Sequence, residues 1–415
     1  MANADAVTIF AEGTFEEQIQ ELVNFLVRNH SDEERTAFIR PFSEALKTEE
    51  GKKPLSENDD RKREIFSHLV PEIKTLGDGT DNEIEGFFNL LFSHIISLYP
   101  TTSADANTLL PPLIHTIAAA PAAQSGLKYR ILTNLFNLLP HSSPLRLNVY
   151  NALLATAAAQ GDLPVLQLSR VNVEKWVSEW DVTPENKSQF LKSIVDAFVQ
   201  ADSLTAAYDF APLYVRSVQV SSTAEAREAA VQAITLALRL PSVFDFDPLF
   251  KLDAVVAAKD HELFPLLQVF LSGGLLEYRS WASANAGIAE KFGLSTADLE
   301  HKIRLLTLAS LGFKHVGQNL PYTTIAQALD VDAAEVEKWV IDVIRAGLVL
   351  GKLSQTTKTL HIVRATARAF EREQWEALEK RLVAWKAGLV GVMEVVANAR
   401  RQGGAVPVQA QVAAA

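Results

Sequence analysis

Residues 299–364 combine three amphipathic helical segments with two short β-strands, and this order limits the possible folds more than any other stretch. Pro321 and Thr323–Thr324 predict the start of the second helix, because a threonine hydroxyl can accept a hydrogen bond from a free backbone amide. The third helix is predicted to be capped by Asp332 and to end at Gly347. The first helix carries an apolar stripe at helical spacing: Ile303, Leu305, Leu306, Leu308 and Leu311.

The two strands are residues 348–353 and 359–365, and the polar turn SQTTK between them predicts a β-hairpin. Three helices and a hairpin in this order are typical of a winged helix. We therefore predict a winged helix over residues 299–367.

The chain before this stretch shows helical patterns almost throughout. Thr14 with Glu17, and Ser31 with Glu34, have the spacing of a capping box, and Thr183 is predicted to cap a further helix. No segment before residue 348 shows a convincing strand pattern. Helices with short polar turns and no strict sequence period predict an irregular helical-repeat solenoid, and the winged helix is a natural cap for its end.

The predicted fold class is therefore mostly α, with a solenoid, a winged helix and one long C-terminal helix. The predicted division is residues 1–200 for an N-terminal helical-repeat region, 201–367 for a second domain (helical part 201–298, winged helix 299–367), 368–400 for the long helix and 401–415 for a disordered tail.

The long helix after the hairpin carries a second apolar pattern. Its apolar residues alternate at spacings of three and four, the a/d repeat of a coiled coil, over three heptads. Such a seam is narrower than the apolar stripe of an ordinary globular helix, which favours a bundle with helices of other chains; packing onto the chain's own solenoid is the alternative. The seam residues are Trp375, Leu378, Leu382, Trp385, Leu389, Val392 and Val396.

Composition excludes several kinds of site. The chain contains no cysteine, so disulfides, zinc–thiolate centres and cysteine nucleophiles are excluded. Gly347, Gly351 and Lys352 resemble a phosphate-binding loop, but the loop is one residue short and Leu353 replaces the required hydroxyl. No catalytic, metal or cofactor motif is present, so we expect neither an enzyme nor a cofactor. The N-terminus lacks a signal-peptide pattern and prolines interrupt the least charged stretch, so no membrane partner is expected.

A winged helix raises the question of DNA binding. The predicted third helix, residues 332–346, carries four acids and two bases, and acids repel phosphate. The net charge of the whole chain is −11, which also disfavours nucleic acid as the main partner. Direct DNA binding is therefore not expected. The wing carries Lys352, Lys358, His361 and Arg364, which predicts at most an incidental contact with an RNA backbone.

The hairpin of the wing is instead predicted to meet a neighbouring subunit, by strand addition or close contact between sheets. The wing residues predicted for this interface are Leu348, Leu350, Lys352, Leu360 and Ile362.

Solenoid, winged helix and trailing helix together resemble the PCI domain, a module of the proteasome lid, the COP9 signalosome and translation initiation factor 3. The run ILTNLF (131–136), the pattern Pro144-x-Arg146-x-x-Val149-Tyr150 and the element Lys175-Trp176-Val177-x-x-Trp180 are similar to the middle of the subunit m family of eukaryotic translation initiation factor 3. The segments KIRLLTLASLGF (302–313) and QWEALEKRLVAWKAGL (374–389) continue the resemblance.

The resemblance implies a non-catalytic scaffold subunit of a cytoplasmic complex that binds the small ribosomal subunit and promotes translation initiation. It assigns residues 201–367 to the PCI domain and the long helix to a bundle shared by PCI and MPN subunits. It also implies subunit a as a neighbour in the PCI arc and the MPN subunits f and h nearby. The alternative is the equivalent PCI subunit of the signalosome or the proteasome lid.

Overall fold

The computed structural model describes residues 13–47, 55, 58–100, 103–218, 223–285, 287–368 and 372–403. The chain forms two compact units that divide between Leu236 and Ala237. Helices make up most of the described residues, and a small three-stranded sheet lies in the second unit. The predicted fold class is therefore confirmed. The last helix continues to Gly403, so residues 401–403 of the predicted tail are helical, and residues 404–415 lie outside the described residues.

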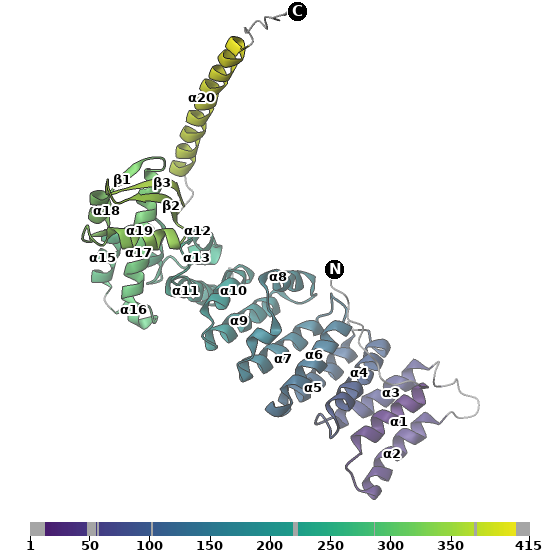
Figure 1. Ribbon diagram of the computed structural model, residues 1–415. Helices are drawn as coiled ribbons and strands as arrows, with labels where there is room; N and C mark the ends of the chain where they lie inside the picture. Colours follow the sequence, from purple (N-terminus) through teal and green to yellow (C-terminus); the bar gives the residue numbers. More distant parts are fainter. Residues whose placement is uncertain are drawn as a thin grey trace, which may run out of the picture. The chain divides into compact units, whose positions relative to one another are not determined.

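The first unit is built from helices that stack side by side in chain order (Figure 1). Short 3-10 turns interrupt the series at Val70–Glu72 (η2), Ala122–Gln124 (η3) and Leu163–Leu166 (η4). The α-helices are α1 Phe15–Leu26, α2 Asp32–Leu46, α3 Asp59–Leu69, α4 Asp81–Leu98, α5 Ala104–Ala119, α6 Ser125–Leu138, α7 Leu145–Gln160, α8 Arg170–Glu179, α9 Pro184–Gln200 and α10 Leu204–Ser217. Helix α11, Thr223–Arg239, runs across the division between the units.

The N-terminal ends of these helices follow the predicted caps. Thr14 and Ser31 each bond the backbone amide three residues on, and the glutamate at that position bonds back. Thr183 accepts from the amide of Asn186 in the same way. A further capping box at Thr80 was not predicted. Each cap satisfies amides that the helix leaves unpaired, which contributes about 1 kcal/mol.

The C-terminal ends of many helices are capped by cations from other helices or from later in the chain. Helix C-termini expose carbonyl oxygens and a partial negative charge, which a guanidinium or ammonium group satisfies. In the first unit Arg61 donates to Ala45 and Lys47, Arg63 to Leu98, Lys128 to Ala118, and Arg146 to Phe136 and Leu139. Of these basic side chains, Lys128 and Arg146 are buried, whereas Arg61 and Arg63 are half-buried.

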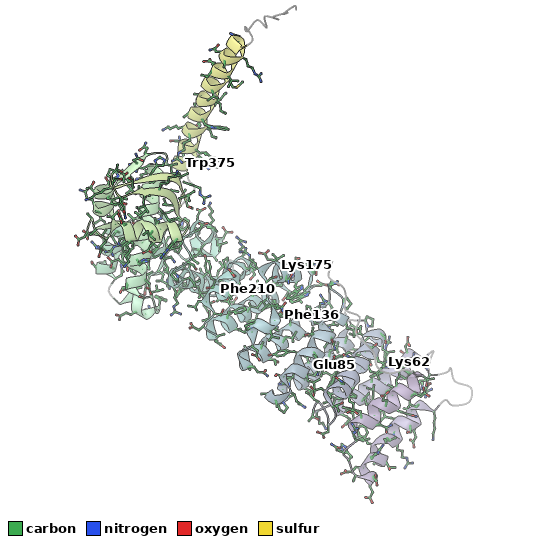
Figure 2. All side chains as sticks on the ribbon, in the orientation of Figure 1. Lys62, Glu85, Phe136, Lys175, Phe210 and Trp375 are labelled. Carbon is green, nitrogen blue, oxygen red and sulfur yellow. The ribbon has the colours of Figure 1, made fainter. Side chains whose placement is uncertain are left out.

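Trp176 and Trp180 lie in an aromatic cluster of the first unit. Trp180 is fully buried and stacks on Trp176 at 6.2 Å between ring centroids. Phe136 and Tyr150 meet the Trp176 ring, and Phe190 packs against Trp180; Figure 2 labels Phe136 in this region. This pair therefore stabilises the solenoid.

The second unit begins with short helices and ends in the winged helix and α20, Arg372–Gly403. The sheet has the antiparallel order β1-β3-β2, so β2 lies at a free edge. The remaining elements are α12 Asp247–Phe250, α13 Asp253–Ala257, α14 Phe264–Ser272, α15 Leu275–Ala284, α16 Ile288–Lys291, α17 Thr296–Lys314, β1 Asn319–Pro321, α18 Tyr322–Leu329, α19 Val336–Arg345, β2 Val349–Ser354 and β3 Thr359–Ala365.

Three details of the winged helix differ from prediction. Strand β1 lies before residue 348, where no strand was expected. Helix α18 begins at Tyr322, whose amide donates to the Lys358 carbonyl, so neither threonine hydroxyl caps it. Helix α19 begins at Val336 and not beside Asp332, because residues 333–335 form a turn first. The first two differences come from contacts with β3, which lies far along the chain, so local patterns do not reveal them.

Gly351 sits in β2 beside a register irregularity and opposite Ile362. A Cβ at this position would lie 2.6 Å from the His361 carbonyl oxygen and 2.9 Å from a Leu360 methyl group. We expect Gly351→Ala to destabilise the winged helix by about 1–3 kcal/mol, because the backbone of β3 must move. The loss of protection of the β2 and β3 amides in hydrogen exchange measures this destabilisation.

The control is Gly126→Ala in α6, whose added Cβ would have no atom within 4 Å. If Gly126→Ala reduced the protection of the surrounding α6 amides as much as Gly351→Ala reduces that of β2 and β3, the steric explanation would be contradicted.

Candidate subunit interfaces

Helix α20 presents its apolar seam to solvent. All seven seam residues are exposed, from 38% for Leu378 to 66% for Trp385. Side chains project from this helix along its length, and Figure 2 labels Trp375 near its start. Large apolar side chains are mostly buried in folded proteins, so a continuous exposed row of them is typical of a surface that another molecule covers.

The apolar face of α20 widens toward its C-terminal end. Between Trp375 and Lys386 the seam is flanked by charged side chains such as Glu379 and Arg381. From Leu389 onward, additional exposed apolar residues lie at the neighbouring heptad positions. Those that the a/d pattern missed are Val390, Met393 and Val395, whereas the first half of the helix adds only Val383. A single partner helix on the seam would leave several of them in water, so the second half of α20 fits a site that is enclosed on more than one side.

By length and composition alone, Leu378–Arg401 would also be sufficient for a membrane span. Lys386 and Glu394 lie within this stretch, and charged residues at the centre of a bilayer are unfavourable by several kcal/mol. The a/d seam of α20, with its alternating spacings of three and four residues, has no role in lipid, whereas a protein bundle uses it directly. The features of α20 therefore favour a protein partner.

Part of the interface predicted for the wing is wrong, because three of its five residues are buried. Leu348, Leu360 and Ile362 are buried in the hydrophobic core of the winged helix, where they hold the sheet against α17 and α19. They are therefore unable to form an outer surface. Leu350 is 52% exposed and Lys352 is exposed, as the interface requires. Two further exposed apolar residues of the wing, Leu353 and Val363, were not predicted.

The exposed face of α19 is less negative than the net charge of residues 332–346 suggests. Asp342 faces His301 at 3.9 Å, and Glu337 accepts a hydrogen bond from Gln355. The exposed side chains of α19 are Lys338, Ile341 and Arg345. The acid count that argued against phosphate binding therefore overstates the negative charge of this face, although Asp332 and Glu335 remain exposed just before the helix.

Within the residues that the structure describes, no group of three or more His, Asp or Glu side chains is arranged to hold a metal ion. The buried cations Lys128, Arg146 and Lys302 all donate to backbone carbonyls at helix ends. Their surroundings explain them as structural groups. The candidate functional surfaces are accordingly α20 and the wing.

Two family models match the chain in these regions. The model described as "eIF3 subunit M, C-terminal helix" matches residues 368–396, which include all seven seam residues, and the PCI domain model matches residues 282–364. Both matches fall on the elements identified above from geometry.

Similar proteins cover nearly the whole chain. Proteins named eukaryotic translation initiation factor 3 subunit M are 32% identical over 401 residues in Phaeosphaeria nodorum, covering 94% of this chain and 88% of the relative. The Aspergillus terreus protein of that name is 33% identical over 413 residues, covering 96% and 89%. The Coccidioides immitis protein is 31% identical over 411 residues, covering 94% and 87%. This chain thus belongs to the family of eukaryotic translation initiation factor 3 subunit M.

Proposed function

We propose that the chain is a non-catalytic scaffold subunit that joins the translation initiation factor 3 complex by burying the apolar face of α20 among helices of other subunits. The single observation that carries this proposal is the exposed a/d seam from Trp375 to Val396. Family membership supports the rest, since the relatives are named as a subunit of this factor.

The composition of the seam suits a stable interface. Each tryptophan buries about 150–250 Å² in a packed interface, and burial of apolar surface contributes about 25 cal/mol per Å². Trp375 and Trp385 are therefore the strongest candidates for anchor residues, because large aromatic side chains commonly dominate binding energy. The leucines and valines between them provide the knobs that a facing helix receives.

The wing supplies a second proposed contact. Strand β2 has a free edge, whose backbone groups can pair with a strand of a neighbouring subunit. Leu350 and Lys352 remain from the predicted interface, and Leu353 and Val363 extend it. We assign this contact to the neighbouring PCI subunit a, and the contact of α20 to the bundle that includes the MPN subunits f and h.

The proposed division of the chain into functional parts follows the domains predicted from the sequence. Residues 1–200 form the helical repeats, 201–367 the PCI domain and 368–400 the bundle helix. The complex acts in the cytoplasm on the small ribosomal subunit, and it promotes mRNA recruitment and initiation. The chain contributes position and contacts to that process, and it carries out no chemical step.

Affinity purification of the tagged full-length chain from its own cells, with mass spectrometry of the intact complex, tests the proposal. We expect PCI and MPN subunits of the initiation factor together with proteins of the small ribosomal subunit. Recovery of signalosome or proteasome-lid subunits instead would contradict the function and leave the fold unaffected. A lone protein bound to nucleic acid would contradict both the partners and the scaffold role.

A further inference from the structure

Helix α20 is attached to the second unit by more than its peptide link. Its described side chains are exposed, yet two arginines, one just before the helix and one within it, reach the ends of other helices. These two contacts connect an otherwise exposed helix to the rest of the second unit.

The first contact is made by Arg368, which follows β3. Its Nη2 atom donates to the carbonyls of Val269 (3.0 Å) and Phe270 (2.5 Å), and its Nη1 atom donates to Gly273 (2.5 Å). These carbonyls form the C-terminal end of α14, where a cation is favoured by the helix dipole. Burial lowers the pKa of Arg368 to about 10, so the guanidinium stays charged at neutral pH.

The second contact is made by Arg381, inside α20. Its guanidinium lies 4.9 Å from the ring centroid of Phe313, and its Nη2 atom donates to the Phe313 carbonyl at 2.8 Å. Phe313 is in the last turn of α17. The ring contact adds a cation–π attraction to the hydrogen bond, which a lysine would reproduce only in part. Both arginines therefore bind the C-terminal end of a helix in the second unit.

A contact at one point allows a helix to swing, whereas contacts at two separated points define a direction. Arg381 lies nine residues beyond Arg372, the first residue of α20, which is about 13 Å of helix at 1.5 Å per residue. Arg368 fixes the chain just before the helix begins. By contrast, Arg372 pairs with Glu376 of its own helix and is largely exposed.

We propose that Arg368 and Arg381 are positioning residues that hold α20 in one direction relative to the winged helix, so that its apolar face meets partner helices without first being ordered. The clamp is a property of the isolated chain, and only its purpose rests on the proposed function. Holding a segment in its bound orientation removes part of the ordering cost of association.

Pulsed electron–electron spin resonance on the full chain tests the clamp. Because the chain contains no cysteine, Lys338→Cys on α19 and Glu394→Cys on α20 give two specific spin labels at exposed sites. We expect a narrow distance distribution that broadens with Arg381→Ala and broadens further with Arg368→Ala added. Arg381→Lys should restore part of the narrow distribution, and the control Arg372→Ala should leave it unchanged.

The same variants are then compared with wild type in competition for incorporation into the complex. Arg381→Ala should lower incorporation by about tenfold, which corresponds to about 1.4 kcal/mol. A broad distribution in the wild type, an unchanged one in Arg381→Ala, or unchanged incorporation despite broadening would each overturn the proposal. Arg381 is exposed, so its variant should fold even if Arg368→Ala does not. Failure of the proposed function looks different: a narrow wild-type distribution with no initiation-factor partners at all.

Discussion

Leu382→Asp in the full-length chain should remove the protein from its complex while both compact units stay folded. Leu382 lies in the middle of the apolar seam and is exposed in the free chain, so a carboxylate there disturbs no internal contact. In the bundle the same carboxylate would be buried without a partner, at a cost of several kcal/mol. Co-purification should fall at least tenfold, and Trp385→Asp should behave alike because it removes an anchor. Quantitative mass spectrometry of the tagged variants measures incorporation, and circular dichroism of the isolated chains checks folding.

The matched control is Ala387→Asp, which adds the same charge to α20 within two helical turns of Leu382. Residue 387 occupies the f position of the heptad, on the side of the helix away from a and d. It should remain incorporated to near the wild-type level. The bundle assignment is wrong if Leu382→Asp and Trp385→Asp both stay in the complex, or if either isolated variant unfolds. Val395→Asp extends the test, because Val395 lies off the seam. If this variant is also lost from the complex, the second half of α20 is enclosed by partner helices on more than one side.

The capped starts of α1, α2 and α9 could be predicted from the sequence, whereas the cationic caps at helix ends could not. A capping box needs two side chains three residues apart, such as Ser31 and Glu34, and both lie in one local pattern. The cationic caps at helix C-termini join residues far apart in the chain, as Arg368 does with Val269. No local pattern distinguishes such an arginine from a solvent-exposed one. The fold class followed from local patterns, and the contacts between helices required the structure.

The candidate site was predictable to different degrees in its two parts. The seam of α20 has a regular period, and the structure exposes all its members from Trp375 to Val396; their role as an interface stays a prediction. The wing has only short strands, in which alternate residues face opposite sides of the sheet. Choosing Leu360 and Ile362 selected the side that packs on the core, because the sequence did not show which face α17 covers.

Replacement of Lys302 by alanine should cause the largest loss of stability in the second unit. Lys302 on α17 is only 2% exposed, and its Nζ atom donates to the carbonyls of Ala237 (2.6 Å) and Leu240 (2.7 Å) at the end of α11. The ammonium group also lies 4.9 Å from the ring centroid of Phe246. Lys302→Ala leaves two carbonyls without donors and a cavity beside them. We expect a loss of about 3–5 kcal/mol, measured as faster hydrogen exchange of α17 amides.

Two further substitutions separate the causes of this loss. Lys302→Met keeps most of the side-chain volume but has no donor, so it should lose only about 1–3 kcal/mol. Lys314→Ala changes an exposed lysine at the end of the same helix and should stay within about 0.5 kcal/mol of the wild type. If Lys314→Ala were as damaging as Lys302→Ala, the effect would come from the loss of positive charge on α17 and not from the two carbonyls.

The stability that Lys302 confers should also depend on pH. Burial lowers the pKa of Lys302 from 10.5 to about 7. Between these two values the unfolded chain holds a proton that the folded chain has released, so the free energy of unfolding rises with pH. Relative to Lys302→Met, the wild type should therefore gain up to about 1.4 kcal/mol per pH unit above pH 7, and nothing below it, where both states carry the proton. Hydrogen exchange at a series of pH values, corrected for intrinsic rates, gives the difference. A difference that stays flat from pH 6 to about 9 would mean that the two carbonyls and the Phe246 ring hold the ammonium charged, against the effect of burial.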